Sequence, residues 1–201
     1  MQRVQDPAEI SFSPNGNYLY VTEKNTNMIT TFHVSGNGVA GAETSEASVG
    51  QTPFGFDFAR DYMVVSNAAG GAPGAGSATS YSGTNTGNLN DANGAIANNQ
   101  GAPCWVASTH FGRFAFTANT ASDDISSYYV SPSGSLYLIH ATIPSGDAPA
   151  DMVVASNNFY VYARCGGDHT IQGYTRTLLG GLNQNGSVTN LPDHAAGLAA
   201  L

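Results

Sequence analysis

Four side chains have the types that proton transfer and anion stabilisation require. Glu9 and Glu23 can each accept a proton from water, and Arg164 can bind a carboxylate or phosphate through two parallel hydrogen bonds. His169 can act as a general acid or base near neutral pH. The ordinary alternative is that both glutamates are solvated carboxylates, that Arg164 pairs with a nearby aspartate, and that His169 is an exposed loop residue.

A second set of side chains has the types that bind a small polar molecule or a cation. Trp105 can stack on a ring, and Asn67, Asn119 and Asp151 can hydrogen-bond to hydroxyl groups. Glu23, Asn67, Asn119 and Asp151 are also oxygen ligands of the kind that hard divalent cations prefer, so a metal site is the alternative to a cofactor-free one. The competing interpretation is core packing for Trp105 and turn formation for the asparagines.

The remaining reactive residue types carry weaker signals. Three further histidines are expected to be surface or packing residues: His33, His110 and His140. Ser66 has no adjacent base and no nucleophile-elbow pattern, which argues against serine hydrolysis. Cys104 and Cys165 lack the spacing of a zinc or redox motif and are expected to be small packing thiols.

An internal repeat must position the candidate residues. Pro7, Pro53, Pro103 and Pro149 are spaced 46, 50 and 46 residues apart, and each precedes strand-like runs separated by tight turns such as Ser13-Pro14-Asn15-Gly16. Propeller blades have repeats of about this length. The sequence therefore predicts an all-β protein with about four four-stranded blades, over about residues 7–49, 53–99, 103–143 and 149–191, with a closing tail at 192–201.

The fourth strand of each unit has the weakest pattern. We expect these strands at 42–49, 95–98, 136–143 and 187–191. Residues 68–100 are rich in Gly, Ala and Ser, so they could be a flexible linker. We favour a blade with long loops, because the flanking prolines keep the repeat register.

Blade geometry predicts which residues meet. In a propeller hairpin the start of the inner strand lies beside the end of the second strand, so both are expected at one end of the central channel. Two residues after the prolines stand Glu9, Gly55, Trp105 and Asp151. At the expected ends of the second strands stand Glu23, Asn67, Asn119 and Arg164.

Composition excludes several functional classes. Six Lys plus Arg against fourteen Asp plus Glu give a net charge of −8, so no basic surface for nucleic acid is expected. Apolar runs are far shorter than the roughly eighteen residues that cross a bilayer, and no membrane partner is expected. The first residues show no secretory signal, which favours the cytoplasm by default, although a longer parent protein could be exported.

Several segments resemble one known family. Residues 12–24, 51–56, 70–73, 104–106 and 191–200 are similar to the lactonase-like seven-bladed β-propellers, which include 6-phosphogluconolactonase and 3-carboxymuconate-lactonizing enzymes. Members have about seven repeats, so the chain resembles the C-terminal four blades. An arc of four blades leaves end strands with unpaired backbone groups, through which copies could associate.

The resemblance implies a lactone hydrolase or lactonizing enzyme that acts on a small anionic sugar acid or muconate-type molecule. Glu23 or Glu9 would then be the base, and Arg164 would bind the anion. The resemblance does not carry over every residue, since members tend to have an Arg-His pair after the blade proline, where this chain has Ala8-Glu9. The alternative is a non-catalytic propeller segment that binds or supports other structures. Convergence of Glu23, Arg164 and a third polar group on one cavity would favour the enzyme.

Overall fold

The computed structural model describes residues 6–200 and contains four antiparallel sheets, which we number blades 1 to 4 in chain order. Blade 1 contains β1 (Pro7–Phe12), β2 (Tyr18–Glu23), β3 (Met28–Val34) and β4 (Ala40–Ala47). Blade 2 contains β5 (Pro53–Ala59), β6 (Tyr62–Asn67), β7 (Ser77–Ser82), β8 (Asn90–Asp91) and β9 (Ile96–Ala97), with the short 3-10 helix η1 (Ala69–Gly71) after β6. Blade 3 contains β10 (Pro103–Ser108), β11 (Phe114–Asn119), β12 (Asp124–Val130) and β13 (Leu136–Pro144). Blade 4 contains β14 (Pro149–Val154), β15 (Tyr160–Cys165), β16 (Thr170–Arg176) and β17 (Leu182–Val188).

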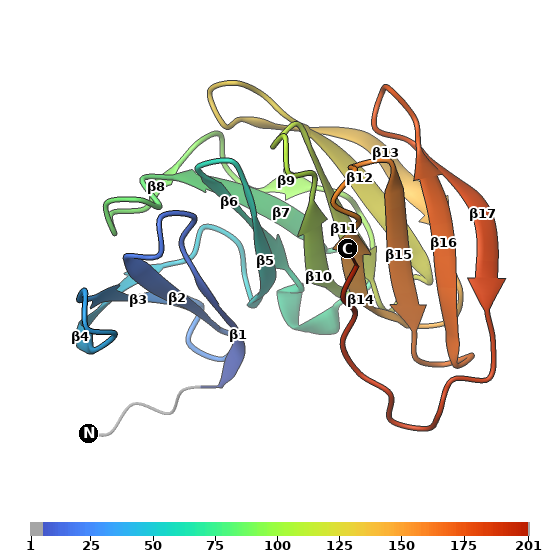
Figure 1. Ribbon diagram of the computed structural model, residues 1–201, viewed down its shortest axis with the longest axis horizontal. Helices are drawn as coiled ribbons and strands as arrows, with labels where there is room; N and C mark the ends of the chain where they lie inside the picture. The colour runs from blue at the N-terminus through green and yellow to red at the C-terminus, as the bar shows by residue number, and fades with distance from the viewer. Residues whose placement is uncertain (1–5, 201) are drawn as a thin grey trace.

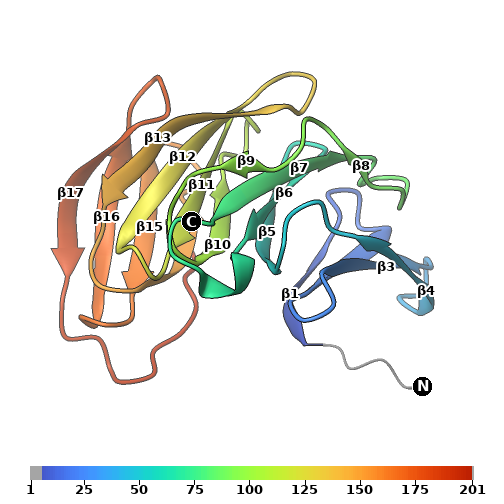
Figure 2. The same ribbon diagram turned by 180° about the vertical axis from the view of Figure 1, so that it is seen from behind.

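The blades fan around one axis, as the repeat predicted. Within blades 1, 3 and 4 the strands pair in chain order, from an inner first strand to an outer last strand, and blade 2 follows this order from β5 to β8. The inner strands contact one another in the order β1, β5, β10 and β14. Figures 1 and 2 show the resulting arc, which is open between blade 1 and blade 4. The predicted all-β propeller architecture is therefore confirmed.

The turns between strands use the residues that their geometry demands. In the hairpin between β1 and β2, the amide of Gly16 donates to the carbonyl of Ser13 at 2.8 Å, and Gly16 has a φ of 73°. Glycine adopts this left-handed conformation without the clash of a Cβ atom. The sequence Ser13-Pro14-Asn15-Gly16 thus fixes the connection that aligns Phe12 with Leu19.

The hydrophobic core lies between the blades. Three separate apolar clusters fill the three contacts between adjacent blades. Tyr20 and Ile29 of blade 1 pack on Phe56, Met63, Val65 and Tyr81 of blade 2. Val64 and Ala78 of blade 2 pack on Val106, Ala115 and Tyr128 of blade 3. Phe116, Ile125 and Ile143 of blade 3 pack on Met152, Val161, Ala163 and Tyr174 of blade 4. Blades 2 and 3 are therefore apolar on both faces, as expected for a sheet covered on both sides.

Two outer strands differ from the prediction. The fourth strand of blade 4 runs over Leu182–Val188 and not over 187–191. In blade 2 the outer position is divided between β8 and β9, which both pair with β7. Residues 68–100 are thus part of blade 2 rather than a separate linker. The strands β8 and β17 are largely exposed, so they lack the apolar alternation that marks inner strands.

Candidate active site

A cavity of about 230 Å³ lies at the axis, between the inner strands of all four blades. Its polar lining includes Glu9 from β1, Asp57 from β5, Trp105 from β10 and Asp151 from β14. His110, in the turn after β10, also lines it. Side chains alternate between the two faces of a strand, so positions two and four residues after each blade proline point to the axis. The repeat therefore gathers three carboxylates on one cavity wall.

Glu9 is held at this wall by a neighbouring blade. Its Oε2 atom accepts a hydrogen bond of 2.6 Å from the backbone amide of Phe56. Burial raises the pKa of Glu9 to about 7; the Phe56 amide opposes this rise, and the charges of Asp57 and Asp151 add to it. At neutral pH the Glu9 carboxyl therefore exists in both protonation states.

Asp57 joins blade 2 to blade 3. Its Oδ1 atom accepts from the amide of Phe58, and its Oδ2 atom accepts from the amide of Ser108, both at 2.7 Å. Burial raises the pKa of Asp57 to about 6, against the effect of these two amides and of the charge of His110. His110 thus faces the carboxylate wall, although its side chain is exposed to solvent.

Asp151 makes the corresponding contact at the end of the arc. Its Oδ1 atom accepts from the amide of Met152 at 2.7 Å, and its Oδ2 atom accepts from the amide of Leu198 at 2.6 Å. Burial raises the pKa of Asp151, and these two amides and the positive charge of Arg164 oppose the rise. The C-terminal tail therefore returns from β17 to the axis, beside β14 (Figure 1).

Trp105 gives the cavity an aromatic wall. It is partly buried, and its ring meets that of Phe54 edge to face, with centroids 5.6 Å apart. Trp105 was predicted to stack on the substrate. In the structure it lines the axial cavity and also packs on Phe54. Its indole N–H is a hydrogen-bond donor.

The raised pKa values predict that the protein loses stability as the pH rises. Glu9 and Asp57 have ordinary pKa values of 4.5 and 3.8 and folded values of about 7 and about 6. Folding therefore favours their protonated forms, and this contribution is present below about pH 4 and is lost as the pH rises through 7. We expect the free energy of unfolding to fall by about 1–3 kcal/mol between pH 5 and pH 8 through these groups.

Urea denaturation of the wild type and of Glu9→Gln at both pH values measures this effect. Glutamine keeps an oxygen that can accept from the Phe56 amide but has no charge to bury, so the variant should show a shallower pH dependence. Equal slopes for the two proteins would contradict the assignment. Glu43→Gln, on exposed β4, should keep the wild-type slope.

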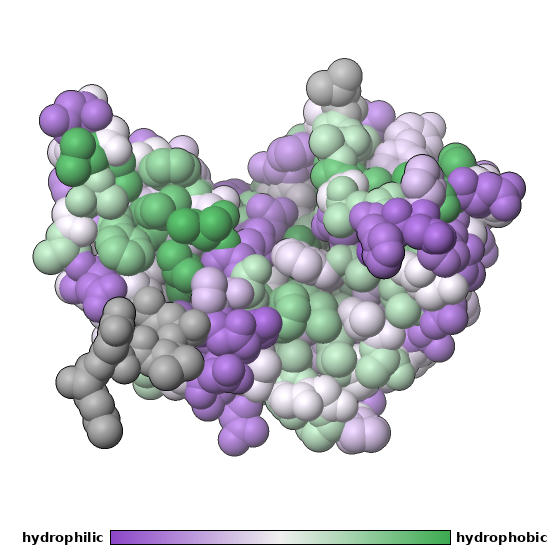
Figure 3. All heavy atoms as spheres, turned by 90° about the horizontal axis from the view of Figure 1, so that it is seen from below, coloured by the Kyte–Doolittle hydropathy of each residue, from purple (hydrophilic) through white to green (hydrophobic). Residues whose placement is uncertain are grey.

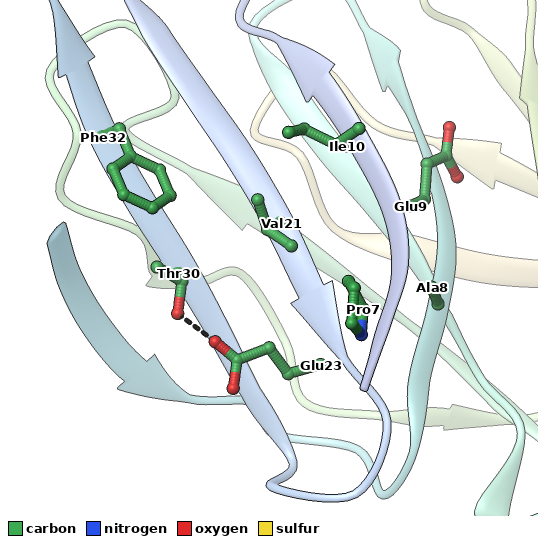
Figure 4. Close-up of a pocket in the computed structure, with 8 residues that line it drawn as sticks. All are labelled: Pro7, Ala8, Glu9, Ile10, Val21, Glu23, Thr30 and Phe32. Atoms are coloured by element: carbon green, nitrogen blue, oxygen red, sulfur yellow. Dashed lines mark hydrogen bonds between the residues drawn. The ribbon is translucent and has the colours of Figure 1, made fainter. Parts of the chain in front are cut away.

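Glu23 lies elsewhere. Thr26 donates to its Oε2 atom at 2.6 Å, and Thr30 donates to its Oε1 atom. Glu23 and Glu9 both line a hollow on the open face of blade 1, but Figure 4 shows the Glu23 carboxylate turned toward Thr30 and the Glu9 carboxylate turned away from it. Alternation along β2 puts Glu23 on the same face as Val21, away from the axis. The expected meeting of second-strand ends at the channel is therefore not observed.

Asn67 and Asn119 are the last residues of β6 and β11, as Glu23 is of β2, and both are fully buried. The Asn67 side chain donates to Ser77 and Thr79, and the Asn119 side chain donates to Asp124 and Ser126. The Asn119 side-chain oxygen also accepts from the Asn98 side chain of blade 2 at 3.0 Å. Neither asparagine lines the axial cavity with Asp151, so the proposed cation ligands Glu23, Asn67, Asn119 and Asp151 do not surround one cavity. Across residues 6–200, no three His, Cys, Asp or Glu side chains form a group that could hold a metal ion.

Arg164 is shifted by one position relative to the prediction. A bulge near the start of β14 pairs Asp151 with Arg164, and the partner of Pro149 is Cys165. Arg164 therefore follows Tyr162 on the outward face of blade 4, where its charge acts on Asp151. Glu23, one of the two predicted bases, lines the hollow on blade 1, which does not include Arg164, so these two groups are not brought together.

His169 is also away from the axis. It ends the turn before β16, and its Nδ1 atom lies 3.7 Å from Oδ1 of Asp193 in the tail. Ser66 bridges two blades: it accepts from the amide of Gly55 at 3.1 Å and donates to the carbonyl of Cys104 at 2.8 Å. Both cysteines are free thiols.

Sequence reasoning missed Asp57 and treated His110 as a turn residue. Counting two residues from each proline found Glu9, Trp105 and Asp151, but at blade 2 it found only Gly55. Strand alternation puts position four on the same face as position two, which would have identified Asp57 between Phe56 and Phe58. His110 has no comparable signal, because it lies in a turn.

No helix within residues 6–200 reaches the length and apolar character that crossing a bilayer requires.

Comparison with known proteins gives a family match over half of the chain. Residues 1–102 match the sequence model of the family described as Lactonase, 7-bladed beta-propeller. A search of curated proteins finds no match.

Solved structures share the fold over nearly the whole chain. A candidate 6-phosphogluconolactonase from Bacteroides fragilis superposes with a TM-score of 0.78 at 16% identity, over 94% of this chain and 56% of that one. The periplasmic gluconolactonase of Pseudomonas aeruginosa gives 0.77 at 16% identity, over 98% of this chain and 61% of that one. A protein of unknown function from Desulfotomaculum acetoxidans gives 0.75 at 14% identity, over 96% and 60%. The chain thus spans about three fifths of the length of these structures.

Proposed function

Because this chain belongs to the lactonase family of seven-bladed β-propellers, we propose that its axial cavity binds a small lactone and supports hydrolysis of the ring ester. The observation that carries the proposal is Glu9, a carboxyl group with a pKa of about 7 at the wall of a polar cavity. A general base works best when its pKa lies near the working pH. The lactonase names of two structural neighbours support the same reaction class.

In the proposed reaction, ionised Glu9 takes a proton from a water molecule as the water oxygen adds to the lactone carbonyl carbon. The carbonyl oxygen becomes negatively charged, and the N–H groups of His110 and Trp105 are the candidate donors to it. The tetrahedral intermediate then breaks the bond between this carbon and the ring oxygen. Glu9 returns its proton to the ring oxygen, and the product is an open-chain hydroxy acid.

The charge of the wall favours an uncharged substrate. Glu9, Asp57 and Asp151 attract hydroxyl groups and repel anions, and none of the described residues that line the cavity is Lys or Arg. The sequence had suggested an anionic sugar acid or muconate-type substrate bound by Arg164. A neutral sugar lactone fits the described wall better, and the anionic substrate is the second candidate.

Acid release from glucono-δ-lactone and from its 6-phosphate tests both the proposed hydrolysis and the proposed preference for an uncharged substrate. The release is followed with a pH indicator and compared with buffer alone. We expect a rate above buffer with a kcat/KM at least about tenfold higher for the neutral lactone, because one added unfavourable charge contact of about 1.4 kcal/mol gives this factor. A higher kcat/KM for the 6-phosphate would contradict the proposed preference for an uncharged substrate, but it would still support lactone hydrolysis. Rates equal to buffer for both would favour the non-catalytic alternative, in which the carboxylates only join blades.

A further inference from the structure

The two ends of the propeller differ in charge. The turns that join first to second strands and third to fourth strands lie at one end, which we call the apical end, and the turns between second and third strands lie at the other. Within residues 6–200, Asp61 is the one carboxylate residue in an apical turn, and it follows Arg60. Arg113 stands in another apical turn, and Arg176 ends β16 beside a third. Figure 3 views the molecule from the opposite end and shows several hydrophilic patches there. The carboxylates of that end outnumber its cations; they include Asp123, Asp147, Asp168 and Asp193, against Lys24 and Arg164.

The apical turn between β16 and β17 carries two leucines that its geometry does not require. Leu178 and Leu179 are 80% and 79% exposed, the highest values among the exposed large hydrophobic residues that the structure describes. Figure 1 shows this turn projecting beyond the end of β15. The amide of Gly180 closes the turn by donating to the carbonyl of Thr177 at 3.1 Å. The corresponding turns of blades 1 and 3 close in the same way and have other residues in the two places, Gly36-Asn37 and Pro132-Ser133.

Two phenylalanines occupy polar positions of the repeat in the same way. Phe111, in the turn between β10 and β11, is 59% exposed and stands where blade 1 has Asn15. Phe159, in the turn between β14 and β15, is 51% exposed and stands where blade 1 has Asn17. Blade 3 is covered on both faces by its neighbours, so the exposure of Phe111 belongs to the apical end and not to the open sides of the arc. The equivalents of Phe159 in blades 2 and 3 are exposed as well; they are Asp61 and Arg113.

Two arginines lie among these apolar side chains. The guanidinium carbons of Arg113 and Arg176 lie 5.7 Å and 5.2 Å from the centre of the same ring, that of Phe114. Arg176 also lies over Phe159, at 5.8 Å, and donates to a backbone carbonyl in each apical turn of blade 4. Burial lowers the pKa of Arg176, and the charge of Arg113 adds to this effect. Neither arginine forms an ion pair with a carboxylate of the described chain. Two positive charges are therefore held close together beside exposed apolar groups.

We propose that these six residues, the apical cluster, dock the protein on the surface of an anionic phospholipid bilayer. The two leucines and the two phenylalanines enter the boundary between headgroups and acyl chains, where burial of apolar area drives binding. The arginines contact lipid phosphates, which a guanidinium group binds through paired hydrogen bonds. The apical cluster consists of Phe111, Arg113, Phe159, Arg176, Leu178 and Leu179.

A lipid surface fits the apical cluster better than a protein partner does. The apolar side chains project from three separate turns, so a protein would need a separate pocket for each of them. A bilayer interface accepts separate apolar groups and supplies phosphates to the charged groups between them. The whole chain has a net charge of −8, but docking by the apical end turns most carboxylates away from the anionic surface. Salt screens charges that lie farther than about 10 Å from the surface.

This proposal narrows one prediction from the sequence. No membrane partner was expected, because the apolar runs are too short to cross a bilayer. Contact with the surface of a bilayer requires exposed turn residues and no crossing segment. The prediction therefore applies to segments that span a membrane and not to docking on one.

Flotation of the full chain with lipid vesicles tests the docking. We expect binding to vesicles that contain phosphatidylcholine and phosphatidylglycerol, and binding about tenfold weaker or less to phosphatidylcholine alone, since each arginine near an anionic surface contributes a factor of about five. Leu178→Ser with Leu179→Ser should weaken binding to the anionic vesicles by about tenfold or more, because less apolar area is buried. Both leucines are exposed, so circular dichroism should show an unchanged fold. Val49→Ser, at a 46% exposed position of the opposite end, is the matched control and should bind as the wild type does.

Arg113 gives a separate test of the charge contribution. Arg113→Gln should weaken binding to the anionic vesicles about fivefold and leave binding to phosphatidylcholine unchanged, whereas Arg113→Lys should keep most of the affinity. A wild type that binds neither kind of vesicle, or a double serine variant that binds as well as the wild type, would overturn the proposal. Light scattering covers the alternative of a protein partner. A wild type that self-associates through the leucines, with a double serine variant of single-chain mass, would overturn the lipid surface as the occupant.

Discussion

Glu9→Gln is expected to lower the catalysed rate of lactone hydrolysis by about 100-fold or more, since general bases contribute factors of about 10² to 10⁴. The amide of glutamine is nearly the same size and can keep the contact with the Phe56 amide, but it cannot accept a proton from water. The loss should therefore appear in kcat more than in KM.

The pH profile gives a second readout of the same prediction. In the wild type, kcat/KM should rise with pH through an apparent pKa near 7, because the ionised form is the base. Asp57 and Asp151 act on the charge of Glu9, so this value belongs to the group of carboxylates. Glu43→Gln on exposed β4 should keep both the rate and the profile. An active wild type with an unchanged Glu9→Gln rate would mean that another group is the base.

Gly55→Ala is expected to be strongly destabilising, with a loss of about 3 kcal/mol in the free energy of unfolding. A Cβ atom on Gly55 would lie 2.4 Å from the carbonyl oxygen of Cys104 and 2.9 Å from Cα of Trp105. These are backbone atoms of β10, which cannot rotate away. The inner strands β5 and β10 would have to separate, and the bridge that Ser66 makes between them would open.

Thermal denaturation measures this change, and a loss of this size corresponds to a drop in Tm of roughly 6–12 °C for a domain of this length. Gly36→Ala is the matched control, because no atom lies within 4 Å of its Cβ position and its backbone is not left-handed. Equal Tm values for the two variants would show that the inner strands can move apart at little cost.

The fold could be predicted because the repeat is periodic in the residues that pack. The blade prolines mark the inner strands, and the aromatic and β-branched runs that follow fill the contacts between blades. The outer strands of blades 2 and 4 could not be placed in the same way. Residues Leu182–Val188 are mostly polar and exposed, so their pairing with β16 follows from the chain path and leaves no pattern in the sequence.

The candidate site was predicted in part. Glu9, Trp105 and Asp151 line the axial cavity because they share a position in the repeat. Glu23 and Arg164 were expected there too, but alternation along β2 turns Glu23 to the open face of blade 1, and Arg164 stands one residue before the end of β15. A shift of one residue along a strand moves a side chain to the other face, and residue types alone do not reveal such a shift.

The core consists of three separate apolar clusters, one in each contact between adjacent blades, which we call seams. This division has a consequence for how such chains can change in evolution. Each seam involves only two neighbouring blades. A gene that duplicates or deletes one repeat therefore adds or removes one seam and leaves the others intact, as in linear repeat proteins. The number of repeats can then change without loss of the other contacts, whereas a methyl group on Gly55 would meet backbone atoms of the next blade directly.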